Sequence, residues 1–221
     1  MVGPSDRVLI PAGVRVIDGS GKFLIPGFWD MHGHLTDATE EAFPLLIMNG
    51  VTGVRDMGGD LTQIDRWRSE IDKGLRVGPH IIRAGPFVDG PKEGVSNRLT
   101  VRTAEEARQA VHNLKAKGVD FIKIHNTLPP DAFFALMDEA RKEHIPVAVH
   151  LPKGVSSAEA SEAGVASLEH IETIRHNNAV LTRFCGSPFT NNLETVRGGL
   201  GMSSYAEDGL LTGDFTGGIG P

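Results

Sequence analysis

The sequence predicts an α/β protein in which parallel strands are joined by helices. Apolar, strand-like stretches alternate with amphipathic helical stretches from Gly27 to His170. Gly50, Gly118 and Gly164 each follow a helical stretch and precede a valine, as a glycine just after a helix and before a strand does. The alternation gives about six strand–helix units of about 25 residues, a spacing typical of βα repeats with helical crossovers.

The elements follow from periodicity and capping. The predicted strands are 28–35, 51–56, 80–88, 121–125, 145–151 and 166–170. The predicted helices are 40–48, 61–73, 104–117, 131–143 and 157–163. The third helix has apolar residues at i, i+3, i+4 and i+7, which places Ala107, Ala110, Val111 and Leu114 on one face. Thr103 with Glu106 and Ser156 with Glu159 have capping-box spacing at helix starts.

Both ends of the chain depart from this pattern. Residues 1–24 contain short strand-like pieces and the turn 18–21, which indicates a hairpin edge. Residues 25–176 form the predicted βα body, and residues 177–221 an irregular tail. The tail is rich in glycine, with 9 in the last 37 positions, and shows no capped amphipathic helix.

Composition excludes several classes of protein. The chain has 22 Lys and Arg against 28 Asp and Glu, a net charge of −6, so we expect neither nucleic acid nor an anionic membrane as a partner. No apolar run reaches the roughly 18–20 residues of a membrane span. The single cysteine, Cys185, excludes an intrachain disulfide. Without a signal peptide in the sequence given, we expect a cytoplasmic protein, or a periplasmic or secreted one if a leader has been lost.

Ligand-type side chains collect at the ends of predicted parallel strands. His32 and His34 are two apart on a strand, so both imidazoles face one way and suit one metal ion. His150 and His170 end two further strands. Lys123 lies between isoleucines in a buried strand, where its charge is costly unless paired or removed. The carboxyl ends of strands in a βα barrel form one rim, where active sites occur.

These residues fall within longer motifs that resemble one family. The segment 25–34, Ile-Pro-Gly-Phe-Trp-Asp-Met-His-Gly-His, resembles the opening strand of the amidohydrolase superfamily of metal-dependent hydrolases. Residues 16–22 resemble the lead-in from its small β-sandwich, and residues 50–59 its second strand, with Gly53 where threonine is more usual. The motifs around Lys123, His150 and 167–170 resemble its fourth to sixth strands. The resemblance covers about residues 14–173 and is greatest to imidazolonepropionase-like enzymes and prolidase-type dipeptidases.

The resemblance implies a fold and a metal centre. The body would be part of a (β/α)8 TIM barrel, preceded by a remnant of the β-sandwich. His32 and His34 would hold one divalent ion and His150 and His170 a second, with zinc as the default. Lys123, carboxylated by CO₂ to a carbamate, would bridge the two. A hydroxide shared by the metals would then attack a carbonyl carbon.

Other polar residues lie near this rim. His125, two residues beyond Lys123, is a candidate substrate contact, with a solvated rim residue as the alternative. Arg55 is a weaker candidate for a substrate carboxylate, with a structural Arg55–Asp56 pair as the alternative. We expect His112 and His144 to be solvated surface residues.

The family pattern is incomplete in this sequence. The resemblance calls for an aspartate at the end of an eighth strand as metal ligand and catalytic base, and Asp214 is only a weak candidate. A barrel of eight units takes about 250 residues. A fragment truncated at both ends, a frame change near residue 175, and a shortened protein closed by its tail or by homo-oligomerisation are the three explanations.

Three functions follow as hypotheses. The first is a metal-dependent hydrolase of amide-type C–N bonds in a small peptide or cyclic amide. The second is a catalytically incomplete fragment that serves as a metal-binding or interaction module. The third keeps the metal site but acts as a lactonase or phosphotriesterase.

Overall fold

A computed structural model describes residues 7–92, 94 and 97–170. Strands and helices alternate as the sequence predicts. The strands are β1 (Phe28–Gly33), β2 (Val51–Asp56), β3 (His80–Arg83), β4 (Phe87–Asp89), β5 (Arg98–Thr100), β6 (Ile122–Ile124), β7 (Val147–Val149) and β8 (Ser167–Leu168). The helices are α1 (Leu35–Ala38), α2 (Ala42–Met48), α3 (Leu61–Asp72), α4 (Ala104–Ala116), α5 (Pro130–Lys142) and α6 (Ser157–Glu162).

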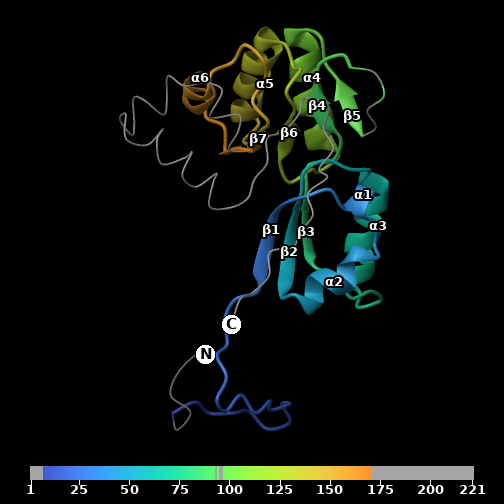
Figure 1. Ribbon diagram of the computed structural model, residues 1–221, viewed down its shortest axis with the longest axis vertical. Coiled ribbons are helices and arrows are strands. Elements are labelled where there is room, and N and C mark those ends of the chain that lie inside the picture. Colours follow the sequence, from blue (N-terminus) through green and yellow to red (C-terminus); the bar gives the residue numbers. More distant parts are fainter. Residues whose placement is uncertain (1–6, 93, 95–96, 171–221) are drawn as a thin grey trace, which may run out of the picture.

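The strands form two parallel sheets. The first has the order β1-β2-β3 and the second the order β5-β4-β6-β7-β8. Figure 1 shows α1, α2 and α3 along one side of the first sheet. In the same view, the second sheet and the helices α4, α5 and α6 lie above the first sheet. In the described part of the chain, β1 pairs only with β2 and β8 only with β7. The parallel α/β class is therefore confirmed, whereas a closed barrel is not formed by the described strands.

The predicted strand 80–88 is divided in two. Gly85 has a φ of 72°, a left-handed conformation that suits glycine, and Pro86 has no N–H to donate to a ladder. The chain turns there, so β3 pairs with β2 while β4 pairs with β5 and β6. Asp120 joins the two sheets at this point, because its backbone N–H donates to the Arg83 carbonyl at 2.9 Å.

Two further details differ from the prediction. Residues 98–100, which lie outside the predicted strands, form β5 at the edge of the second sheet. Leu35, expected to end the first strand, begins α1 instead, because its backbone N–H donates to the Asp56 carboxylate at 2.8 Å. The structure has no strand in residues 7–27, although the turn closed by Lys22 N–H and the Gly19 carbonyl is present. The expected hairpin edge is thus reduced to a turn, and the β-sandwich remnant stays a prediction.

Each sheet has its own apolar core beneath its helices. In the first, Phe43, Trp67 and Ile64 from the helices pack on Val54 and Ile81 from the strands. In the second, the predicted face of α4 and a similar face of α5 cover β4, β6 and β7. A small third cluster links strands of both sheets through Met57, Ala84, Phe121 and Ala148. Apolar burial of this kind fixes the strand ends relative to one another.

The helix boundaries agree with the capping residues. The Thr103 side chain accepts from Glu106 N–H, and Ser156 and Glu159 form a reciprocal capping box. Gly50, Gly118 and Gly164 have φ values of 77°, 66° and 87°, as predicted for residues that end a helix. No helix of the described chain is long and apolar enough to cross a bilayer. The expected domain boundaries stay predictions, and the one at 176/177 lies outside the described residues.

Candidate metal centre

Five imidazoles lie in one continuous row at the carboxyl ends of the strands. The ring centroids are 5.4 Å apart for His34 and His32, 4.6 Å for His32 and His170, 4.8 Å for His170 and His150, and 4.6 Å for His150 and His125. They come from four strand ends, those of β1, β6, β7 and β8. The structure therefore brings together the histidines that the sequence analysis selected.

Parallel pairing is the reason for this convergence. Ile124 is opposite Val149, so His125 and His150 follow the ends of adjacent strands in the same register. Val149 is opposite Leu168, which places Glu169 and His170 at the next strand end. His170 has a φ of 63°, a strained conformation for a non-glycine residue.

Lys123, two residues before His125 in the chain, is almost fully buried. Its side chain belongs to β6, the residue is 2% exposed, and Nζ has no hydrogen-bond partner among the described residues. Burial lowers the pKa of Lys123 to about 8, with the charge of Arg55 acting in the same direction and that of Glu169 opposing it. An unpartnered ammonium in such a place is costly, so the site fits a lysine that loses its positive charge.

Two histidines of the row, His150 and His32, favour the neutral form. Burial, then the charges of His125, His170 and Lys123, lowers the pKa of His150 to about 4. Burial also lowers the pKa of His32, against the opposing effect of its hydrogen bond to Glu169. A metal ion binds the unprotonated ring nitrogen, so these environments suit metal ligation.

A carboxylate outside the row contacts His32. Nδ1 of His32 lies 2.8 Å from Oε2 of Glu169, and the other oxygen of Glu169 accepts from Arg55 at 2.6 Å and from the Ser167 hydroxyl at 2.6 Å. Arg55 also donates to the Met31 carbonyl at 2.7 Å and to the Ser167 hydroxyl at 3.1 Å. Its guanidinium thus serves contacts within the chain, and its proposed contact with a substrate stays a prediction.

Asp56 does not pair with Arg55, contrary to the structural alternative drawn from the sequence. Its fully buried carboxylate instead accepts backbone hydrogen bonds from Leu35 at 2.8 Å and from Gly58 at 3.2 Å. Burial raises the pKa of Asp56. Nδ1 of His34 lies 3.3 Å from the Gly58 carbonyl. Asp56 therefore holds two backbone segments next to His34: Leu35, which follows it in the chain, and Gly58, which contacts its ring.

His125 lies at the end of the row next to an aspartate and a phenyl ring. Its Nδ1 is 3.4 Å from Oδ2 of Asp89, and its ring centroid is 5.1 Å from that of Phe87. Burial of Asp89 would raise its pKa, but the contact with His125 and the hydrogen bonds from Thr127 and Gly90 outweigh this and lower the pKa to about 2. His125 is therefore held at the rim, and its contact with a substrate stays a prediction.

The sequence analysis missed the roles of Glu169, Asp56 and Asp89. Asp56 and Asp89 are the last residues of β2 and β4, and Glu169 directly follows β8 and precedes His170, so their positions carried a signal. Their partners could not be read because they come from other strands. Asp214 and Cys185 lie outside the described residues.

A second group of metal-ligand types lies away from the row, between α4 and α5. Ring nitrogens of His112 are 3.2 Å from Glu139 and 3.7 Å from Glu143, and one atom from each residue falls within 4.8 Å of the others. Lys142 pairs with Glu139 at 2.8 Å, and Lys115 pairs with Glu143. Because lysines already neutralise both carboxylates, this group acts as an ion cluster that links the two helices. His112 is half exposed, as expected, but it is not merely solvated.

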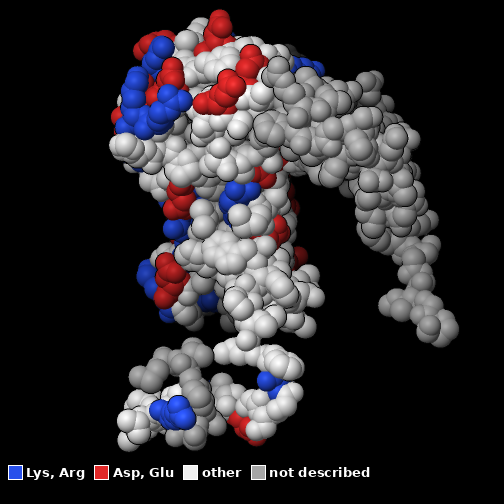
Figure 2. Space-filling model, turned by 90° about the vertical axis from the view of Figure 1, so that its left-hand side faces the viewer, with Lys and Arg blue, Asp and Glu red and all other residues white. Residues whose placement is uncertain are grey.

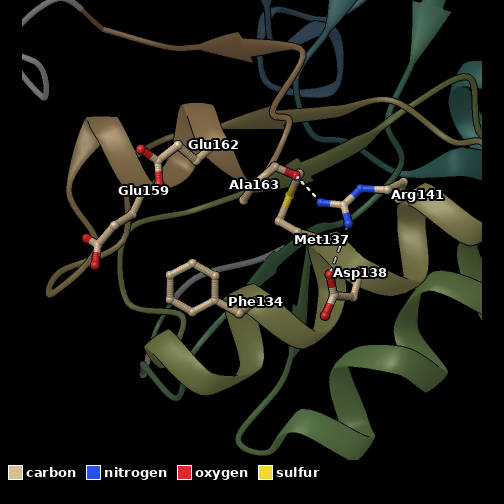
Figure 3. Close-up of a pocket in the computed structure, with 7 residues that line it drawn as sticks. All are labelled: Phe134, Met137, Asp138, Arg141, Glu159, Glu162 and Ala163. Carbon is tan, nitrogen blue, oxygen red and sulfur yellow. Dashed lines mark hydrogen bonds and ion pairs between the residues drawn. The ribbon is translucent and has the colours of Figure 1, made fainter.

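A pocket also lies away from the strand ends, on the part of the chain that the structure describes. Figure 3 shows a pocket between α5 and α6, lined by Phe134, Met137, Asp138, Arg141, Glu159, Glu162 and Ala163. Arg141 fills part of it and bonds to the Ala163 carbonyl at 2.9 Å and to Asp138 at 3.4 Å. Figure 2 shows acidic and basic side chains side by side on the face that it presents. The row of imidazoles is thus the strongest candidate site in the described chain.

The parallel strands and the row of imidazoles define a βα protein with a histidine-rich rim. The sequence model described as Amidohydrolase family matches residues 23–182, and the chain belongs to that family. A comparison with curated proteins gave no match.

Solved structures share this fold. A candidate prolidase from Bifidobacterium longum is 29% identical with a TM-score of 0.65, and the match covers 80% of this chain and 49% of that one. An Xaa-Pro dipeptidase with bound methionine is 21% identical with a TM-score of 0.54, covering 69% and 52% of the two chains. Phenylurea hydrolase B is 22% identical with a TM-score of 0.57, covering 74% and 50%. The last two show the fold alone, and the chain spans about half the length of these structures.

Proposed function

We propose that the chain carries the metal centre of a hydrolase that cleaves amide-type C–N bonds in a small peptide or cyclic amide. The observation that carries the proposal is Lys123, a buried amine without a hydrogen-bond partner beneath a row of imidazoles. Membership of the amidohydrolase family and the likeness to a candidate prolidase support the bond type.

The residues present fit two divalent ions, with zinc as the first choice. In the proposal, His32 and His34 would hold one ion and His150 and His170 the other, as the family resemblance implies; the ring centroids are 5.4 Å apart in the first pair and 4.8 Å apart in the second. Lys123 joins both as a carbamate, which turns its costly positive charge into a negative one between cations. Bound ions of this kind supply an activated water and polarise a carbonyl.

The other residues act on the substrate and on the fold. His125, held beside Asp89, is proposed to contact the substrate at one end of the row. The catalytic base is assigned to an aspartate outside the described residues, for which Asp214 is the candidate in this chain. We further propose that the two sheets are parts of a (β/α)8 barrel, which the closeness of Arg55 in β2 to Ser167 in β8 supports.

Metal analysis and hydrolysis by the full chain test this function. The purified chain, supplied with zinc and bicarbonate, should bind two ions and hydrolyse members of a dipeptide and lactam set. His32→Ala and Lys123→Ala should each lose bound metal and activity. His112→Ala, in the outer ion cluster, is the matched control and should keep both. Activity that survives both His32→Ala and Lys123→Ala would disprove the assignment.

A non-catalytic module is the second candidate, because the chain spans about half the length of the structures that it matches. It predicts metal binding that depends on His32 and Lys123, with no turnover of any tested amide. The same experiment separates the two functions, since only the first predicts turnover.

A further inference from the structure

Glu169 contacts His32 of the candidate metal centre on one side and Arg55 and Ser167 on the other. Its side chain is 7% exposed, and one carboxylate oxygen lies 2.8 Å from Nδ1 of His32. The other oxygen is held by Arg55 and Ser167, both at 2.6 Å. The carboxylate therefore has a fixed position from which it can orient the His32 ring.

The chemistry of this contact determines which nitrogen of His32 carries the proton. An ionised carboxylate has no proton to donate, so Nδ1 must donate to it. Arg55, 2.6 Å away on the other oxygen, favours the ionised form of Glu169. A neutral imidazole with its proton on Nδ1 keeps its lone pair on Nε2, the form in which a ring binds a metal ion.

Charge adds a second effect. Arg55 lies 2.6 Å from one oxygen of Glu169, and the other oxygen contacts His32. Without the carboxylate, the positive charge of Arg55 near the row would oppose the binding of a divalent cation. Glu169 offsets part of this charge at the place where the proposed ligand His32 lies.

We propose that Glu169 is a positioning residue, which holds the proton of His32 on Nδ1 and thereby presents Nε2 to a divalent cation. The inference rests on the proposed function for its metal, but the state of His32 can be measured without metal or substrate. Glu169 itself touches neither reacting atoms nor substrate in this assignment.

The first test reads the tautomer of His32 in the metal-free, full-length chain. A long-range ¹H–¹⁵N spectrum of ¹⁵N-histidine protein, with His32 assigned from a His32→Gln spectrum, should show the proton on Nδ1. In Glu169→Met, which has no acceptor, the signal should move toward the Nε2–H form. In Glu169→Gln, whose amide oxygen still accepts, it should remain on Nδ1. An Nε2–H signal in the wild-type chain overturns the proposal, even if Glu169→Met does not fold.

The second test measures zinc affinity by competition with a chelator. Glu169→Met should bind zinc about 10- to 100-fold more weakly than the wild type, the usual cost of losing such a partner. Glu169→Gln is the matched control, because its amide oxygen can still accept from Nδ1 of His32; it should bind zinc more tightly than Glu169→Met. Equal losses in both variants would indicate a merely structural role and overturn the inference.

The two proposals fail in different ways. A wild-type chain that takes up no zinc contradicts the proposed function, whereas the tautomer of His32 tests the positioning role on its own. Zinc binding with an unchanged tautomer and affinity in Glu169→Met leaves the proposed function intact and overturns only the role of Glu169.

Discussion

At the level of single residues, the candidate site consists of groups whose environment disfavours positive charge. Lys123 and His150 both have a lowered pKa, and burial is the first cause in each. Asp89 and Glu169 have carboxylates whose hydrogen bonds outweigh burial and lower the pKa. Neutral nitrogens beside ionised carboxylates are the arrangement that a cation site requires.

Replacing Lys123 by methionine should stabilise the metal-free chain. The substitution exchanges a buried, unpartnered amine for an apolar side chain of similar length, a gain of about 1–3 kcal/mol. Because the folded-state pKa of about 8 lies below the ordinary 10.5, the penalty is full below the former and disappears as pH rises toward the latter. Urea unfolding across this range measures it. The exposed Lys117→Met is the control, and a less stable Lys123→Met at neutral pH would contradict the prediction.

The stability of the metal-free chain should decrease as the pH is lowered through a defined range. The His150 imidazole accepts a proton near pH 6.5 when unfolded but only near pH 4 when folded. The unfolded state thus binds more protons between these two pH values. The contribution of His150 to the free energy of unfolding is therefore fully present above pH 6.5 and is lost as the pH falls from 6.5 to about 4. Urea midpoints across the range should show this slope, and His150→Gln should flatten it. Identical slopes for the two proteins would rule out His150 as the source.

At the level of elements, each functional side chain stands just beyond the end of a strand. β6, β7 and β8 are only two or three residues long, yet parallel pairing places His125, His150 and Glu169 at successive ends. The helices between them set the spacing. α6 lies in the chain between His150 and His170, and its first turn is secured by the Ser156–Glu159 capping box.

Removing this cap should weaken the chain measurably. Ser156→Ala deletes the hydroxyl that accepts from Glu159 N–H at 3.2 Å, and the loss of such a cap costs about 1 kcal/mol. The free energy of unfolding from urea titration is the measurement. Ser161→Ala, an exposed change within the same helix, should cost nothing. A similar loss in both variants would show that the cap has no special effect.

At the level of the whole molecule, Arg55 connects the two sheets. From β2 it reaches the Met31 carbonyl in β1 and, in the other sheet, Ser167 and Glu169 at the end of β8. Both partners of the Arg55–Glu169 pair are largely buried, with side chains 17% and 7% exposed. Breaking a buried pair leaves one charge uncompensated, which is the main source of its cost.

Removal of Arg55 alone should therefore destabilise the fold, because it leaves the charge of Glu169 unpaired. Arg55→Met should lower the free energy of unfolding by about 3 kcal/mol. The double variant Arg55→Met with Glu169→Met should lose less than the sum of the two single changes, because no unpaired charge remains. A double-mutant cycle by urea unfolding gives the coupling. Strict additivity would show that the two side chains do not interact across the sheets.

Local patterns were sufficient for most of the helices and strands and for selecting the side chains that meet at the strand ends. The i, i+3, i+4, i+7 spacing in α4, the glycines after helices and the capping pairs all act within a few residues, so they can be read directly along the chain. His32, His34, Lys123, His150 and His170 could be chosen for a similar reason. Their positions at strand ends follow from each strand alone, and parallel pairing then brings them to one rim.

Contacts between distant parts of the chain were decided only in three dimensions. His32 and Glu169 are 137 residues apart, and Arg55 and Glu169 are 114 apart, so no local pattern pairs them. The division of the predicted strand 80–88 also depended on which neighbour each half could pair with, once Gly85 and Pro86 interrupted the ladder. Burial, and with it the lowered pKa of Lys123 and His150, likewise exists only after the helices and strands have packed around these side chains.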